Sequence, residues 1–258
     1  MTQTQRHAKI VESLRATGVA SVRELAESLQ VSESTIRRDL KLLDANGELI
    51  RSYGGAALAL RDMTNGAMTE EHPFDVTATT DRAMKEAMAE QAAALVADDS
   101  VVLLDIGTST SLIARRLRGR PVTVITSNVG VLDELRDDDA VRLVMLGGVL
   151  RRNYQSLVGS LTEKAMRQVS ADIAFLSCTG VRANGHVVDD MAVEAPIKQA
   201  MIEAADRVAL VASETKFPGT GSLRLCSLAD IDVLVTTGGA DPQTLELCRQ
   251  AGGKVITA

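Results

Sequence analysis

Apolar residues in the first 60 positions recur every three or four residues, which is the period of an α-helix. The pattern predicts three helices, over residues 4–15, 21–29 and 32–43. Their buried faces are expected to be formed by Ile10, Val11, Leu14, Leu25, Ala26, Leu29, Ile36, Leu40 and Leu43. Ser21 and Glu24 match a capping box at the start of the second helix. Residues 48–57, with glycines at the tip, predict a short hairpin, or wing.

The third helix leaves hydroxyl and basic side chains on its outer face: Ser32, Ser34, Thr35, Arg37, Arg38 and Lys41. Hydroxyls can approach base edges or phosphates, and guanidiniums can bind guanine or the DNA backbone. On the wing, Arg51 and Tyr53 could contact the sugar–phosphate backbone. Residues 1–60 are therefore predicted to form a winged helix-turn-helix domain that binds double-stranded DNA. The alternative is a small winged bundle that binds another protein.

Residues 61–79 have neither a helical nor an alternating period, which predicts a linker. From residue 80, an Ala-rich helix to about residue 96 precedes seven short apolar runs that predict strands, at 101–106, 122–126, 142–146, 172–177, 208–212, 233–236 and 254–257. Helices are predicted between them, at 110–117, 129–135, 161–169, 193–205 and 242–251. Val- and Leu-rich strands that alternate with helices are typical of a mostly parallel sheet covered on both faces. Residues 80–258 are therefore predicted to form an α/β domain.

A polar loop follows the first predicted strand of this domain, beginning at Asp105. Gly107 permits close backbone approach, and Thr108, Ser109 and Thr110 offer hydroxyls beside the free N–H groups of a helix start. This arrangement suits a phosphate. Ser and Thr also commonly cap helices without binding a ligand, so both interpretations are open.

Ligands of such folds bind at the carboxyl ends of the strands, and further polar residues and glycines follow strands of this chain. These candidates are Asn128, Gly148, Gly180, Glu194 and Lys216. Lys216 could neutralise a phosphate or pair with a sugar hydroxyl, and Asp105, Asn128 and Glu194 could bind hydroxyls. Taken singly, each is better explained as a surface or cap residue, so the prediction of a site depends on their convergence.

The net charge of the whole chain and the charges of its two parts lead to different expectations about DNA binding. The net charge of -6 over 258 residues argues against nucleic-acid binding, because phosphate contacts dominate that affinity. Residues 1–57, however, hold eight basic and seven acidic residues, so the acidity belongs to the remainder, with 20 basic and 27 acidic residues. A barely basic DNA-binding domain predicts weak binding by one copy and a need for paired half-sites.

Composition otherwise fits a globular protein, with 45% hydrophobic and 24% charged residues. The three cysteines lack metal-ligand spacing and are expected to be reduced thiols. His186, Asp189 and Asp190 are a weak candidate for a metal site, because adjacent aspartates after a glycine turn usually face water. We therefore expect no metal and no cofactor. With no leader pattern and no apolar run near 18 residues, the expected location is the cytoplasm.

Residues 21–57, with the run from Val31 to Leu40 and the wing glycines, resemble the DeoR family of bacterial repressors. The resemblance extends over about residues 5–258 and implies an effector domain similar to ribose 5-phosphate isomerase. It implies that Thr108 and Thr110 contact phosphate and that Asp105, Asn128 and Lys216 contact the sugar. Two departures from the family pattern are Pro196, early in a predicted helix, and the run Ala212 to Thr215 before Lys216.

The predicted function is sequence-specific repression of a carbohydrate-metabolism operon, relieved by a phosphorylated sugar. The resemblance implies homodimers or homotetramers, which would pair recognition helices on the operator. The alternative from another class is a sugar-phosphate isomerase with an accessory winged domain, in which Asp105 or Glu194 moves a proton and Lys216 stabilises an enediolate. The attached winged domain argues against an enzyme.

Overall fold

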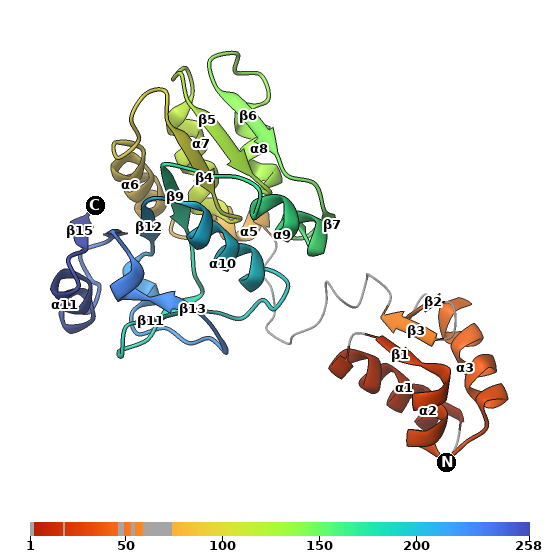
Figure 1. Ribbon diagram of the computed structural model, residues 1–258. Coiled ribbons are helices and arrows are strands. Elements are labelled where there is room, and N and C mark those ends of the chain that lie inside the picture. Colours follow the sequence, from red (N-terminus) through yellow and green to blue (C-terminus); the bar gives the residue numbers. More distant parts are fainter. Residues whose placement is uncertain (1–2, 18, 46–48, 53–54, 59–73) are drawn as a thin grey trace. The chain divides into compact units, whose positions relative to one another are not determined.

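The computed structural model describes residues 3–17, 19–45, 49–52, 55–58 and 74–258 (Figure 1). Contacts divide the chain into two compact units, Met1–Met68 and Thr69–Ala258. None of the helices in the described ranges is long and apolar enough to cross a membrane.

The first unit is a winged helix-turn-helix. Its helices are α1 (Gln3–Thr17), α2 (Val22–Leu29) and α3 (Glu33–Ala45), and its strands are β1 (Val19–Ser21), β2 (Leu49–Ser52) and β3 (Gly55–Leu58). The strands form a three-stranded antiparallel sheet in the order β1-β3-β2, so the predicted hairpin is confirmed and β1 is an addition. The capping box is also confirmed, because the Ser21 hydroxyl accepts the Glu24 N–H and the Glu24 carboxylate accepts the Ser21 N–H. The predicted helix faces meet in one buried apolar cluster.

The second unit is built on a seven-stranded parallel sheet in the order β15-β14-β12-β9-β4-β5-β6. All seven strands agree with the predicted apolar runs to within two residues: β4 (Val101–Leu104), β5 (Thr123–Thr126), β6 (Arg142–Met145), β9 (Ile173–Leu176), β12 (Val208–Val211), β14 (Val233–Thr236) and β15 (Lys254–Thr257). The prediction of a mostly parallel α/β fold is confirmed.

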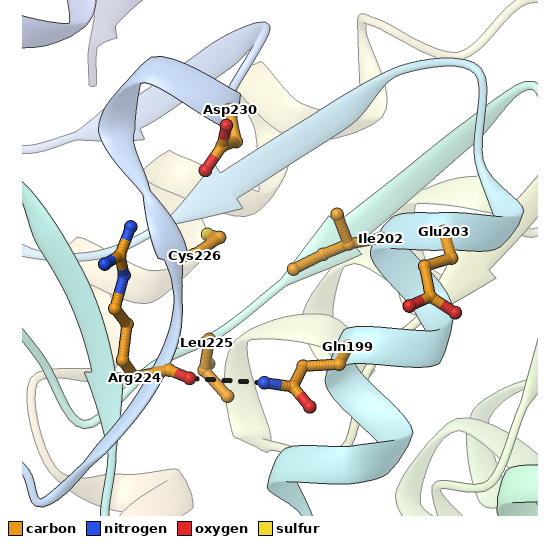
Figure 2. Close-up of a pocket in the computed structure, with 7 residues that line it drawn as sticks. All are labelled: Gln199, Ile202, Glu203, Arg224, Leu225, Cys226 and Asp230. Carbon is orange, nitrogen blue, oxygen red and sulfur yellow. Dashed lines mark hydrogen bonds between the residues drawn. The ribbon is translucent and has the colours of Figure 1, made fainter.

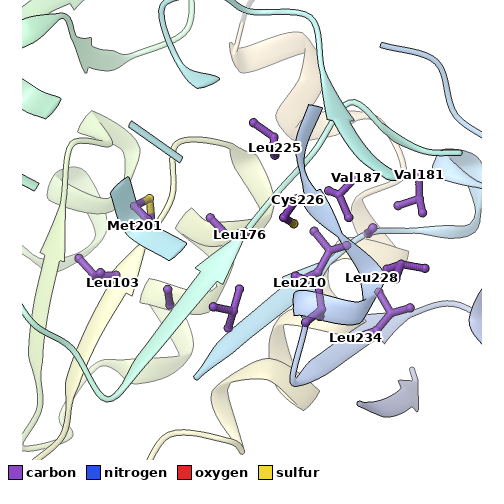
Figure 3. Packing of buried hydrophobic residues seen from close by; sticks show 14 of the residues in the cluster. Leu103, Leu176, Val181, Val187, Met201, Leu210, Leu225, Cys226, Leu228 and Leu234 are labelled. Carbon is purple, nitrogen blue, oxygen red and sulfur yellow. The ribbon is translucent and has the colours of Figure 1, made fainter. Parts of the chain in front are cut away.

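Successive strand residues point to opposite sides of the sheet, and on both sides they are apolar and buried. Helices therefore cover both faces. On one face, α6 (Arg82–Ala93), α7 (Thr108–Leu117) and α8 (Val129–Leu135) pack against a cluster that includes Val102, Val124 and Phe175. On the other face, α9 (Ser160–Met166), α10 (Ala195–Ala204) and α11 (Pro242–Gln250) pack against Leu103, Leu176 and other residues shown in Figure 3. Pro196 stands in the first turn of α10, where its missing N–H costs no hydrogen bond.

Several short elements of the second unit were not predicted. The helix α5 (Phe74–Thr79) lies in the segment where we expected only a linker. A hairpin of β7 (Val149–Arg151) and β8 (Ser156–Val158) follows β6, and a small antiparallel sheet joins β10 (Gly180–Val181), β11 (His186–Asp189) and β13 (Leu223–Ser227). Two short 3-10 helices are η1 (Glu214–Lys216) and η2 (Leu228–Asp230). All of these elements have six residues or fewer, too few to show a period in the sequence.

Candidate functional site

The outer face of α3 carries the side chains that we assigned to DNA from the sequence. The Ser32 hydroxyl accepts a hydrogen bond from the Thr35 N–H (3.2 Å), and so it caps the helix. Thr35 is half-buried, and the other predicted residues of this face are exposed: Ser32, Ser34, Arg37, Arg38 and Lys41. Arg37 pairs with Glu33 at 2.6 Å, but exposed ion pairs contribute little stability, so the guanidinium remains able to turn to another acceptor. Arg51 lies in β2 opposite Ala56, and Tyr53 lies outside the described residues.

The inner side of α3 holds a buried carboxylate that we did not single out from the sequence. Asp39 is 2% exposed and accepts hydrogen bonds from Arg6 Nε (2.5 Å) and Arg6 Nη2 (3.1 Å), while His7 Nε2 lies 3.0 Å from it. Burial opposes ionisation, but Arg6 and His7 prevail and hold the pKa of Asp39 below its ordinary value. This cluster fixes α1 against the helix that carries the exposed basic residues.

The second candidate site lies where the strand order of the parallel sheet reverses. From β4 the chain continues outward through β5 and β6, and it then returns to the other side of β4 with β9. Ligands of open α/β sheets bind in the crevice at such a switch point, outside the carboxyl ends of the strands. A cavity of about 200 Å³ lies there, lined by Ile106 after β4 and by Ser177, Cys178 and Thr179 after β9. Burial raises the pKa of Cys178 to about 12, so this thiol is neutral.

A buried lysine on α10 joins two aspartates at this cavity. Lys198 Nζ donates to Asp105 Oδ2 at 2.7 Å and lies 3.3 Å from Asp189 Oδ2, and all three side chains are less than 5% exposed. Burial alone would lower the pKa of Lys198, but the two carboxylates hold it above its usual value. For Asp189 burial is again the opposing influence, and Lys198 with two backbone N–H groups keeps its pKa low. Lys198 and Asp189 are therefore both charged at neutral pH.

Both aspartates are fully engaged by the protein itself. Asp105 accepts from the Ile106 N–H (2.7 Å), the Ser177 N–H (2.9 Å) and the Ser177 hydroxyl (2.7 Å), in addition to Lys198. Asp189 accepts from the N–H groups of Asp190 and Met191 and from the Thr179 hydroxyl. Carboxylates bound in this way hold the ends of β4, β9 and β11 together and have little capacity left for a ligand.

A second buried ion pair borders the same cavity. Glu194, the residue before α10, pairs with Arg151 at the end of β7, and both side chains are at most 5% exposed. The Arg151 guanidinium lies over the ring of Tyr154, 5.4 Å from its centroid. Tyr154 and Glu194 both line the cavity. The β7–β8 hairpin thus contributes an aromatic wall and the partner of Glu194.

The polar loop after β4 begins α7 two residues earlier than predicted, at Thr108. Gly107 is the N-cap, with φ of 144°, and no side chain caps the helix, so the interpretation of these residues as simple caps is not supported. Thr110 donates its hydroxyl to the carbonyls of Asp105 and Gly107, and Asn128 donates its amide to the same two carbonyls. Among the described residues, no hydrogen bond engages the hydroxyls of Thr108 and Ser109. The helix start therefore presents free donors on a loop held by Thr110 and Asn128.

The remaining candidates take different places around this region. Lys216, at the end of η1, lines the cavity and is half-buried, and no described residue forms a hydrogen bond or ion pair with its ammonium group. At Gly180 an added Cβ would lie 2.6 Å from Gly219 Cα, so this glycine permits the close approach of the chain that follows Lys216. At Gly148 an added Cβ would lie 2.8 Å from the Val158 carbonyl, so this glycine permits packing within the β7–β8 hairpin.

Of the residues singled out for the effector, the cavity wall itself includes Glu194 and Lys216. Asp105 lies behind it, and Gly107 lies beside Ser177. Thr108, Ser109 and Thr110 form the start of α7, and Asn128, which caps α8, donates its amide to Thr110. Sequence reasoning missed Lys198, although a signal existed: Lys198 shares a helix face with Ile197 and Met201, both buried. It also missed Arg151 and Tyr154, whose positions depend on contacts between distant parts of the chain.

A separate hollow of about 560 Å³ lies between α10 and β13, and none of the predicted residues lines it (Figure 2). Gln199 on α10 donates its amide to the Arg224 carbonyl at 3.3 Å across this hollow. Glu203, Arg224 and Asp230 at its rim are exposed and of mixed charge, so the hollow has no selective character of its own.

The chain matches two family models. Residues 6–61 match the DeoR-like helix-turn-helix domain, and residues 80–238 match the DeoR C terminal sensor domain. The glycerol-3-phosphate regulon repressor of Escherichia coli K12 is 30% identical over 92% of this chain and 91% of that protein. The HTH-type transcriptional regulator GlpR of Haloferax volcanii is 30% identical (99% of this chain, 98% of that protein), and the L-fucose operon activator of Haemophilus influenzae is 28% identical (93% and 94%).

Among solved structures, ribose 5-phosphate isomerase A of Methanocaldococcus jannaschii is similar with a TM-score of 0.40 and 17% identity, over 53% of this chain and 55% of that one.

Proposed function

Since the chain belongs to the DeoR family of DNA-binding transcriptional regulators, we propose that it represses an operon of carbohydrate metabolism. The first unit binds the operator, and a phosphorylated sugar at the switch-point cavity of the second unit releases it. The observation that carries this proposal is the outer face of α3, where exposed hydroxyl and basic side chains stand on a helix fixed from behind by Asp39. The similarity to a protein named as a glycerol-3-phosphate regulon repressor also supports a role in repression.

The contacts to DNA follow from the position of each group on α3. This helix has 13 residues and rises about 1.5 Å per residue, so about 20 Å of it can lie in a major groove. Ser32, Ser34 and Thr35 at its start reach base edges or phosphates, while Arg37, Arg38 and Lys41 bind guanine or the backbone. Arg51 and Tyr53 of the wing contact the backbone beside the groove. Weak binding by one copy is overcome by a homodimer or homotetramer on paired half-sites.

The effector is an anion because the groups left open at the second site are donors. Three acids of the site are already paired with cations: Asp105 and Asp189 with Lys198, and Glu194 with Arg151. The fourth, Asp190, accepts the Ser222 N–H. The free N–H groups of α7, the hydroxyls of Thr108 and Ser109, and the Lys216 ammonium remain for a ligand. A phosphate fits these donors, and a helix start favours its charge. Thr110 and Asn128 hold the loop at residues 105–110, here called the phosphate loop. Gly107, Gly148 and Gly180 shape the surrounding backbone.

The same engagement of the acids argues against the alternative of an isomerase. A general base must have a free lone pair within reach of the proton that it removes. Asp105 already accepts hydrogen bonds from Ile106, Ser177 and Lys198, and Glu194 is held by Arg151. Each carboxylate therefore already has a cationic partner and is held by the protein. Incubation with pentose and hexose phosphates tests this directly, because measurable isomerisation would favour the enzyme.

The test of the proposal uses the full-length chain and DNA fragments selected by it from its own genome. Selected fragments are titrated in gel-shift assays with glycerol 3-phosphate, pentose 5-phosphates, hexose 6-phosphates and inorganic phosphate. We expect at least one sugar phosphate to weaken operator binding by about 5- to 150-fold, the usual range of coupling between two sites. If no genomic fragment is bound at low salt, or if no compound changes the affinity, the proposal is wrong.

Thr108→Val is the matched test of the phosphate loop, because it removes a hydroxyl and keeps the shape of the side chain. We expect DNA affinity to be unchanged and the response to the sugar phosphate to be lost. Thr257→Val, at the exposed end of β15 on the far edge of the sheet, is the control and should respond like the wild type. A normal response of the Thr108 variant would remove this residue from the site.

A further inference from the structure

The helix α5 lies directly behind one wall of the switch-point cavity. The Phe74 ring is 8% exposed and meets the Tyr154 ring edge-on, with centroids 6.2 Å apart and planes at 88°. The Phe74 N–H also donates to the Asn153 carbonyl at 2.8 Å. Gly130, at the start of α8, makes room for the ring, since a Cβ there would lie 2.6 Å from Phe74 Cζ. Phe74 thus anchors α5 to Asn153 and to Tyr154, and Tyr154 lines the cavity.

Contacts continue from this anchor into the cavity. Tyr154 lines the cavity on one side and touches Phe74 on the other. Its ring also lies under Arg151, the partner of Glu194. Further along α5, the Thr77 carbonyl accepts a hydrogen bond from Lys85 of α6 at 2.5 Å. The start of α5 is therefore in contact with a residue that lines the cavity, and its middle is bonded to α6.

The docked form of α5 depends on these contacts. The helix has six residues, and isolated helices shorter than about 12 residues are marginal in water, so its own hydrogen bonds do not maintain it. Its helical form requires Phe74 to stay in place. Phe74 supports the Tyr154 ring that lines the cavity, so a ligand that packs against this ring binds the docked state more tightly than the released state. Ligand and docked helix therefore stabilise each other, as reciprocal linkage requires.

We propose that α5 is the element that couples the cavity to the DNA-binding unit, an inference that rests on the function proposed above. Residues 59–73 join the last strand of the first unit to α5. While α5 is docked, this connection is fixed at Phe74. When α5 is released, the six residues of the helix join the connection, and at about 3.3 Å per residue they lengthen it by about 20 Å. When the ligand keeps α5 docked, the connection is shorter. Two DNA-binding units of an oligomer then reach two half-sites less easily, and operator binding is weaker.

The test compares Phe74→Ala with Leu245→Ala in the full-length chain. Leu245 is 7% exposed on α11, which packs against the opposite edge of the sheet, so its variant controls for the loss of buried apolar surface. The probe is the compound from the panel above that weakens operator binding most in the wild type. Because coupling is reciprocal, we expect Phe74→Ala to weaken probe binding by about the factor by which the probe weakens operator binding in the wild type, while the effect of saturating probe on operator affinity falls below about twofold. Leu245→Ala should keep the wild-type response.

Hydrogen exchange gives a direct view of the helix in the same three proteins. In the wild type and in Leu245→Ala, the probe should slow amide exchange over residues 74–79 by about tenfold, and in Phe74→Ala these amides should exchange fast with or without it. A full operator response in Phe74→Ala would overturn the inference and leave the proposed function standing. Probe affinity equal to that of the wild type would also overturn it, because the cavity would then not be coupled to the docking of α5. If no compound acts on the wild type, the proposed function fails and the inference fails with it.

Discussion

The cluster of Lys198, Asp105 and Asp189 permits a quantitative prediction. Lys198→Met keeps the length and apolar stem of the side chain and removes its charge, leaving two carboxylates that are at most 4% exposed without their cation. Breaking a buried ion pair by removing one partner costs about 3–5 kcal/mol, because the remaining charge is buried and uncompensated. The other donors to both aspartates remain in place. We therefore expect the lower end of this range, about 3 kcal/mol at pH 7.

The pH dependence separates this electrostatic effect from a general loss of packing. In the wild type the pKa of Asp189 is depressed, so its contribution to stability is present above the unfolded value of about 3.9 and is lost as the pH falls through the lower folded value. In Lys198→Met, burial dominates and raises the pKa of Asp189 above 3.9. Protonation then relieves the variant as the pH falls. The difference from wild type should be largest at pH 7 and smaller at pH 5.

Calorimetry of the full-length chain checks both statements, since the transition of the second unit should move by about 2–4 °C for each kcal/mol, or about 10 °C at pH 7. Lys164→Met is the matched control, because Lys164 is an exposed lysine on α9 and its loss should change stability by less than about 0.5 kcal/mol. Lys198→Met with Asp189→Asn removes one of the uncompensated charges and should recover part of the loss. A loss below about 1 kcal/mol, or a loss that is the same at pH 5 and pH 7, would refute the reasoning.

Two further predictions concern the first unit. Arg37→Ala should weaken operator binding by about 1–3 kcal/mol if the side chain reads a base, whereas Arg23→Ala, an exposed arginine on α2, should have a smaller effect, and equal gel-shift affinities of the two would exclude Arg37 from base contacts. Asp39→Ala should destabilise the first unit by about 1–3 kcal/mol, because Arg6 and His7 lose a buried acceptor. Since the pKa of Asp39 is depressed, this difference should be complete above about pH 4 and vanish at lower pH, and a thermal-unfolding series without that trend would contradict it.

The sequence predicted those parts of the fold that short-range patterns determine. The strands β12 (VALV) and β14 (VLVT) are Val- and Leu-rich runs, and all of their residues are buried on a sheet covered on both faces. The capping box of α2 and the buried stripe of α3 are equally local, because the interacting residues stand three or four positions apart. The family resemblance indicated that the winged helix-turn-helix and the α/β domain belong to one kind of regulator.

The candidate site was predictable only in outline, because its contacts join distant residues. Arg151 and Glu194 are 43 positions apart, and Asp105 and Lys198 are 93 apart, so no spacing rule associates them. Glu194, the N-cap of α10, and Lys198 stand four positions apart, which the sequence alone would suggest is a surface ion pair. In the structure each has a different buried partner. The six residues of α5 were missed for another reason, since their helical form depends on one aromatic contact rather than on a periodic pattern.

The charge of the second unit shows why its acids must be neutralised locally. Residues 58–258 hold 27 acidic and 20 basic residues, so the general field of this part of the chain repels a phosphorylated ligand. At physiological ionic strength that field is screened beyond about 8 Å, and the groups within contact distance decide binding. Each acid nearest the cavity would repel a phosphate if it were free. Lys198 and Arg151 are committed to Asp105, Asp189 and Glu194, which leaves Asp190 as the acid of the cavity lining without a cation. For the phosphate site that we propose, these buried ion pairs reduce the repulsion that the anion meets without contributing a contact to it.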